Sequence, residues 1–124
     1  MAKSIQDITE IIKKFREDRG WANDIPTELI TALTAEFGEL AEHYLWKKEF
    51  WELSEEEKDE IGFEFVDVLF YLFTLADHSG IDIEKAFDKK VPLLEKKFPV
   101  DATNEEHRKA RKEYKKSGKN RLYS

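Results

Sequence analysis

The sequence predicts an all-α protein with an antiparallel core of four helices and an additional basic helix at its C-terminal end. Apolar residues recur at helical spacing in successive segments, capping signals precede these segments, and glycine or proline follows them. No segment has convincing strand periodicity, and the short connections favour antiparallel neighbours. With 124 residues, the chain has the size of one domain.

The first two predicted helices cover residues 4–19 and residues 27–48. Ser4 and Asp7 resemble a capping box, isoleucines follow at helical spacing, and Gly20 ends the first helix. A turn signal separates the two helices. Leucine, alanine and aromatic residues at helical spacing form the apolar face of the second helix.

The third predicted helix covers residues 54–78 and contains the most apolar segment of the chain. Ser54 and Glu57 form a second capping box at its start. Residues 63–75 are apolar over a wide arc, which predicts a central and buried helix. Because this arc is wider than one four-helix monomer can cover, we also expect a partner surface on it.

Two shorter helices are expected after the third. The fourth covers residues 82–90, and Pro92 ends or kinks it because proline lacks an N–H donor. Residues 92–97 are the alternative, a short new helix that this proline opens. A third capping box opens a basic tail helix over residues 103–116, and Gly118 is expected to stop it.

The net charge of −6 is unevenly distributed along the chain. Residues 1–103 carry −11 and residues 104–124 carry +5. An acidic body suits cation binding and argues against nucleic-acid binding, which needs a basic face. No stretch approaches the roughly 18–20 apolar residues that span a bilayer, and the N-terminus lacks a secretory signal. We therefore expect a cytoplasmic protein that binds neither nucleic acid nor a membrane.

Two pairs of acidic residues interrupt the apolar helix faces. Glu36 and Glu39 lie three residues apart on the second helix, and Glu64 and Asp67 have the same spacing on the third. This spacing puts both members of a pair on one helix face. Two carboxylates 6 Å apart repel each other by about 3 kcal/mol at an effective dielectric constant near 20. If antiparallel packing joins the pairs, the site must protonate or bind cations, and oxygen ligands favour Mg²⁺ or Mn²⁺.

Other interpretations of these residues compete with a metal site. Acidic spacings of this kind also occur on solvated helix faces, and the glutamates of residues 55–60 form such a face. A di-iron bundle needs Glu-x-x-His, and none of the three histidines follows a glutamate at that spacing. Cysteine is absent, which excludes thiol catalysis and thiolate zinc sites, and no phosphate-binding glycine loop or Ser-His-Asp arrangement is present. Hydrolysis with a hard metal is favoured over redox chemistry.

The compound motif resembles that of a known enzyme family. Glu36-Phe-Gly-Glu39, a spacer of 24 residues and Glu64-Phe-Val-Asp67 resemble the E-x-x-E…E-x-x-D signature of the MazG-like all-α nucleoside triphosphate pyrophosphatases. The likeness covers roughly residues 5–100 and is greatest to the dCTP pyrophosphatase branch. Three aromatic residues match positions of that branch: Trp21, Trp46 and Tyr71.

The resemblance implies Mg²⁺-dependent hydrolysis of a nucleoside triphosphate to a monophosphate and pyrophosphate, in nucleotide-pool house-cleaning. It implies that the four acidic residues bind Mg²⁺ or a substituting Mn²⁺, with Glu39 as candidate base, and that dCTP or a modified cytosine nucleotide is the substrate. The three aromatic residues are candidates for base stacking, with a structural role as the alternative. Lys47 and Lys90 are candidate phosphate contacts. Homo-oligomers, dimers or tetramers, are also implied.

The resemblance divides the chain into a helical catalytic domain over residues 1–100 and a basic helical tail over residues 101–124. Leu94 occupies a position where family members have asparagine, and Pro92 interrupts the helix before it. A different class of function stays open at this point: a non-catalytic helical oligomer or partner-binding module whose carboxylates hold a structural cation.

Overall fold

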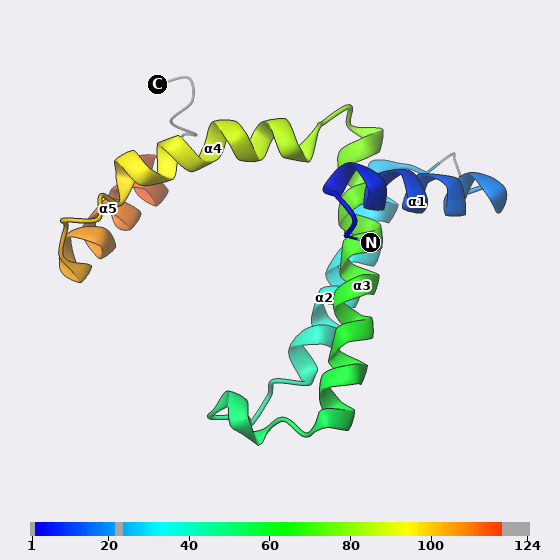
Figure 1. Ribbon diagram of the computed structural model, residues 1–124, viewed down its shortest axis with the longest axis horizontal. Helices are drawn as coiled ribbons and strands as arrows, with labels where there is room; N and C mark the ends of the chain where they lie inside the picture. The colour runs from blue at the N-terminus through cyan, green and yellow to red at the C-terminus, as the bar shows by residue number, and fades with distance from the viewer. Residues whose placement is uncertain (1, 22–23, 118–124) are drawn as a thin grey trace. The chain divides into compact units, whose positions relative to one another are not determined.

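The computed structural model describes residues 2–21 and 24–117, and this part of the chain contains helices and no strand (Figure 1). The all-α prediction is confirmed. The elements are α1 (Ile5–Asp18), α2 (Pro26–Glu42), the short 3₁₀-helix η1 (Phe50–Glu52), α3 (Glu55–His78), α4 (Ile83–Lys97) and α5 (Asn104–Ser117).

The chain forms two compact units, Met1–Ile81 and Asp82–Ser124, which we call the N-terminal and C-terminal units. In the N-terminal unit, α2 and α3 lie side by side and antiparallel, and the segment with η1 joins them at one end (Figure 1). Helix α1 packs on α3, where the Phe15 and Phe70 rings meet edge to face at 5.4 Å. The predicted domain boundary at residue 100 remains a prediction.

Local signals fix the starts of α1 and α3 as expected. The Ser4 side chain accepts a hydrogen bond from the Asp7 N–H, and the Asp7 carboxylate accepts one from the Ser4 N–H. Ser54 and Glu57 form the same reciprocal pair at the start of α3. The predicted capping boxes of these two helices are confirmed.

Helix α2 is shorter than predicted, since it ends at Glu42 and not near residue 48. The chain then tightens into three-residue turns, in which the Leu45 N–H bonds to the Glu42 carbonyl and the Lys47 N–H to the Tyr44 carbonyl. Trp46 between them has a φ of 70°, a left-handed conformation that a helix cannot contain. Apolar residues continue at helical spacing through these turns, so the sequence pattern predicts a longer α2 than the structure contains.

Helix α4 is longer than predicted and includes Pro92 in its interior. The expectations that Pro92 ends the helix near residue 90, or opens a separate helix at 92–97, are wrong. A proline removes one N–H donor from the ladder, and here the helix continues on both sides of it. α5 begins after Thr103, whose hydroxyl accepts from the Glu106 N–H at 3.1 Å. The predicted stop at Gly118 lies outside the described residues.

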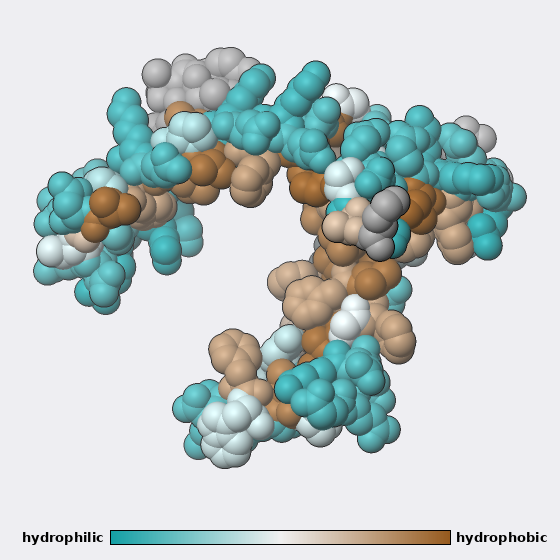
Figure 2. Space-filling view, viewed as in Figure 1, coloured by the Kyte–Doolittle hydropathy of each residue, from teal (hydrophilic) through white to brown (hydrophobic). Residues whose placement is uncertain are grey.

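Only a few of the apolar residues of the N-terminal unit are buried among the described residues. Its buried apolar residues come from α1, α2 and α3: Ile12, Leu29, Leu40, Ile61 and Phe73. One part of the apolar arc of α3 is exposed in the single chain, since Phe63 is 72% exposed and Phe65 and Val66 are also exposed, and the predicted partner surface on this arc remains a prediction. Figure 2 shows apolar side chains on the visible face of the α2–α3 pair. Among the described helices, none has the length and apolar character to span a membrane.

Candidate metal centre

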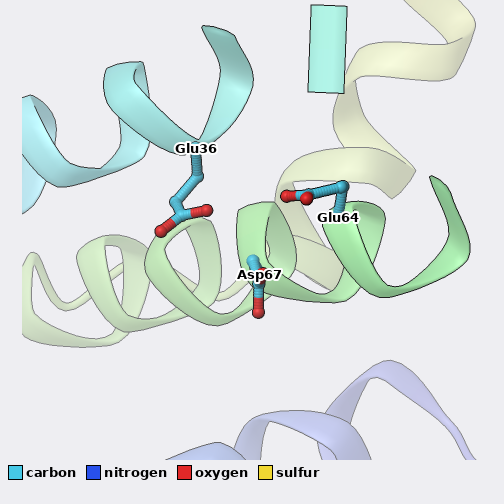
Figure 3. Close-up of side chains that lie close together, drawn as sticks. All are labelled: Glu36, Glu64 and Asp67. Carbon is cyan, nitrogen blue, oxygen red and sulfur yellow. The ribbon is translucent and has the colours of Figure 1, made fainter. Parts of the chain in front are cut away.

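Three carboxylates lie close together on the α2–α3 pair, as Figure 3 shows. Glu36 comes from α2, and Glu64 and Asp67 come from α3. One carboxylate oxygen of each lies within 4.8 Å of the others. Antiparallel packing of the two helices brings Glu36 close to Glu64 and Asp67; Glu36 and Glu64 are half-buried and Asp67 is exposed.

Burial makes this group of three acidic residues electrostatically unfavourable by itself. Glu36 and Glu64 are half-buried, and the Oε2 atom of each is buried and has no hydrogen-bond partner. Burial raises the pKa of Glu36, and a side-chain hydrogen bond with Glu39 and the negative charges of Glu39, Asp67 and Glu64 raise it further. Orphaned buried carboxylate oxygens are costly in a folded protein.

The donor set fits a hard divalent cation. Carboxylate oxygens from two rigid helices are the ligands that Mg²⁺ and Mn²⁺ prefer, and a cation would satisfy both orphaned oxygens. Glu39 is exposed and lies outside the group of three, although it is close enough to Glu36 to influence its pKa. Of the four predicted carboxylates, the structure therefore brings three together and leaves the fourth at their edge.

His43 is a neighbour of this centre that sequence reasoning missed. Its Nε2 atom lies 3.7 Å from Oε1 of Glu64. The residue three positions before His43 is Leu40 and not a glutamate, so the Glu-x-x-His pattern does not include this histidine. A different signal could have found it, since His43 follows Glu36 by seven residues, two helical turns, and so lies on the same side of the helix.

Two of the three predicted aromatic residues share one pocket. Trp21 and Tyr71 line a pocket of about 270 Å³ in the N-terminal unit. Ala32 and Tyr71 place this pocket beside the carboxylates, because Ala32 precedes Glu36 and Tyr71 follows Asp67 by four residues. One helical turn is about 5.4 Å, so the pocket and the acidic centre are adjacent along both helices.

The remaining predicted residues lie elsewhere. Trp46 lies in the turn after α2 and is 94% exposed. It does not line the pocket that Trp21 and Tyr71 share. Lys47 Nζ lies 3.1 Å from Oε2 of Glu57 and thus pairs with a carboxylate outside the metal centre. Lys90 belongs to the C-terminal unit, where its Nζ donates to the Tyr114 hydroxyl at 3.2 Å.

Three carboxylates that lie close together on an antiparallel helix pair place the chain among all-α proteins with a candidate metal centre. Comparison with known proteins narrows this class. The chain matches the model of the MazG-like family over residues 32–114, and it belongs to that family.

The relatives and a solved structure agree with this assignment. The chain is 30% identical to human dCTP pyrophosphatase 1 over 113 residues, which cover 86% of this chain and 65% of the human protein. It is 31% identical to the rat dCTP pyrophosphatase 1 over 104 residues, 78% of this chain and 60% of that protein. The chain thus spans less than two thirds of the length of these relatives. A pyrophosphatase from Archaeoglobus fulgidus DSM 4304 aligns with a TM-score of 0.67 and 30% identity, over 80% of this chain and 95% of that one.

Proposed function

We propose that the protein is a nucleoside triphosphate pyrophosphohydrolase that requires a divalent cation, Mg²⁺ with Mn²⁺ as a substitute. Water and the triphosphate give a nucleoside monophosphate and pyrophosphate, and the bond that breaks joins the α-phosphate to the β-phosphate. The observation that carries this proposal is the group of Glu36, Glu64 and Asp67, with two buried oxygens that lack partners. The names of the relatives, dCTP pyrophosphatase 1 and a pyrophosphatase, support the same reaction.

The acidic residues have different roles in this proposal. Glu36, Glu64 and Asp67 hold the cation, which when bound neutralises phosphate charge and acidifies water. Glu39 is exposed, as Asp67 is, and lies at the edge of this group, so it orients the attacking water and accepts its proton. The acidic centre alone would repel a triphosphate, which explains why the reaction needs the cation.

The adjacent pocket supplies the base site in this proposal. Trp21 and Tyr71 line it and offer aromatic surfaces on which a base can stack. The favoured substrate is dCTP or a modified cytosine nucleotide, in keeping with the relatives' names. Removal of such nucleotides would clean the nucleotide pool of the cytoplasm.

Assembly into homodimers or tetramers is a part of the same proposal. Trp46, Phe63 and Phe37 are 94%, 72% and 60% exposed, a large apolar exposure for a single chain. A second copy would cover this surface and could bring its Trp46 to the base site of the first. Residues 1–100 form the catalytic domain in this proposal, with residues 101–124 as a basic tail, and neither nucleic acid nor a membrane is a partner.

Lys47 and Lys90 are the proposed phosphate contacts. Lys47 would exchange its partner Glu57 for a phosphate oxygen when substrate arrives. Lys90 lies on α4, four positions before Leu94, which stands where the family has asparagine; without that amide, we assign the phosphate contact on this helix to the lysine.

The test is an assay of pyrophosphate release by the purified protein over a panel of ribo- and deoxyribonucleoside triphosphates, with and without Mg²⁺. We expect release that needs Mg²⁺ and yields the monophosphate. A second function is favoured by the exposed apolar surface: a partner-binding helical oligomer with a structural cation. That function predicts no release from any triphosphate, and a di-iron centre would instead give bound iron and visible absorbance.

A further inference from the structure

The pocket beside the metal centre has a charged wall that stacking does not explain. Arg16 of α1 is buried, and its Nη2 donates a hydrogen bond to Oδ2 of Asp24, the residue two positions before α2. The side chains are 10% and 20% exposed, respectively, and both line the pocket. An ion pair removed from water to this extent costs desolvation, so its position on a pocket wall calls for a function.

Arg16 holds the pocket's aromatic wall and its carboxylate together. Its carbonyl accepts a hydrogen bond from the Trp21 N–H at 2.9 Å, and its guanidinium lies 5.7 Å from the centre of the Trp21 ring. The Trp21 ring also meets Phe15 edge to face at 6.0 Å. The stacking surface and the Asp24 carboxylate are thus fixed relative to each other by one buried side chain.

Asp24 retains an unused acceptor. Among the contacts of the described residues, only its Oδ2 is engaged, by Arg16, which leaves Oδ1 for a ligand in the pocket. The Arg16 guanidinium donates to Oδ2, and a carboxylate oxygen accepts hydrogen bonds and does not donate them. Glu28 lines the same pocket, so the polar wall that faces a ligand is predominantly acidic.

We propose that Asp24 is the residue that selects the base: it accepts a hydrogen bond from the exocyclic amine at position 4 of a pyrimidine or position 6 of a purine. A base with a carbonyl oxygen at that position meets the carboxylate with two acceptors facing each other, and it is rejected. This inference rests on the proposed function, because it places the base in the pocket and the phosphates at the acidic centre one helical turn away. The substrate class is therefore the amino-bearing nucleotides, those of cytosine and adenine.

Arg16 is a positioning residue in this scheme. Its contact with Asp24 Oδ2 restricts the rotation of that carboxylate, whereas a solvent-exposed aspartate would rotate freely. Discrimination then comes from an unpaired buried acceptor in the complex with the wrong base, and such a loss is larger than the gain from one extra contact.

The experiment compares dCTP with dUTP, which differ at position 4 by an amine against an oxygen. We expect the wild-type kcat/KM to be about 10–100-fold higher for dCTP, the range expected for one hydrogen bond to a charged group. Asp24→Asn keeps the shape and a partner for Arg16 but can turn an N–H toward O4 of uracil. We expect this variant to lose the preference, mainly through a lower kcat/KM for dCTP. Equal ratios in wild type and variant would overturn the proposal.

A matched control and a second readout keep the outcomes separable. Asp18→Asn breaks the exposed pair of Asp18 with Lys14 on the same helix, and it should leave the ratio unchanged. Asp24→Glu retains the charge and moves the carboxylate by one methylene, so it should lower the ratio even if Asp24→Asn does not fold. If the wild type hydrolyses neither triphosphate, the proposed function fails, and calorimetric binding of dCMP against dUMP still tests Asp24: equal affinities in the wild type would overturn its role.

Discussion

Two acidic regions of the α2–α3 pair differ in how their charge is compensated. Near the start of α3, Glu57 has Lys47 Nζ at 3.1 Å and accepts a hydrogen bond from the Ser54 N–H, and these contacts lower its pKa. Two turns later, Glu64 meets Glu36 and Asp67, and the pKa of Glu36 is raised. In the first region, the ammonium group of Lys47 compensates the charge of Glu57. The second region needs a cation from solution. This difference separates a structural pair from a candidate metal centre on the same helix.

The largest expected effect follows from removing a carboxylate of the second region. Asp67→Ala or Glu39→Ala should lower the pyrophosphate-release activity by at least about 10²-fold, because cation catalysis supplies several kcal/mol. Glu57→Ala, which removes a carboxylate of the first region, is the matched control and should retain most of the activity. The measurement is kcat/KM with excess Mg²⁺.

Circular dichroism of the same variants decides whether a loss of activity is a loss of fold. We expect the helical signal to stay at the wild-type level in all three. Retained activity in Asp67→Ala or Glu39→Ala, or an equal loss in Glu57→Ala, would remove the distinction between the two regions.

The next effect in size is thermal stabilisation by the cation. A ligand at 100 times its Kd stabilises the folded state by about 2.7 kcal/mol, which corresponds to a rise in Tm of about 10 °C for a chain of this size. We expect Mg²⁺ to raise the Tm of the wild type by this order, as followed by scanning calorimetry. Na⁺ at matched ionic strength is the control for screening.

The Tm of Glu36→Gln, measured in the same way, tests whether the carboxylates of the metal centre repel each other. The amide removes one negative charge from a buried group of like charges, so we expect the metal-free variant to melt a few degrees above the metal-free wild type. Mg²⁺ should then add little further stability. A variant that melts below the metal-free wild type would show that the carboxylates do not repel each other in the absence of metal.

The sequence contains most of the information for the separate helices. Capping side chains at Ser4 and Ser54 are local signals, and they give the starts of α1 and α3 directly. The end of α2 was missed because the left-handed turn at Trp46 has no glycine to mark it. The continuation of α4 through Pro92 was missed because one lost hydrogen bond need not end a helix whose other bonds persist.

The candidate site could be predicted in part for similar reasons. Acidic residues at a spacing of three within apolar faces predict Glu36, Glu39, Glu64 and Asp67, because helix geometry puts each pair on one face of its helix. The structure brings three of the four together and leaves Glu39 at their edge. The approach of His43 and the buried pair of Arg16 with Asp24 depend on how three helices pack, and no local pattern encodes that. The width of the apolar arc predicts that some of it is exposed in one chain, but not that Phe63 is in the exposed part, because an apolar face has the same sequence whether it meets another helix or another copy.

The smallest expected effect concerns the first region, where the charge of Glu57 contributes to the stability of the fold. The pKa of Glu57 is lowered from 4.5, first by the Lys47 side chain and then by the Ser54 N–H, so the folded state favours its charged form. Its contribution to stability is therefore present above pH 4.5 and is lost as the pH falls through the lowered value. Glu57→Gln should lower the Tm of the metal-free protein at pH 7 and have less effect at pH 3. Glu56→Gln, one residue earlier in the same first turn, is the matched control because the Glu56 side chain makes no hydrogen bond or ion pair with another described residue. An equal Tm difference at both pH values would mean that Lys47 does not stabilise the fold through the charge of Glu57.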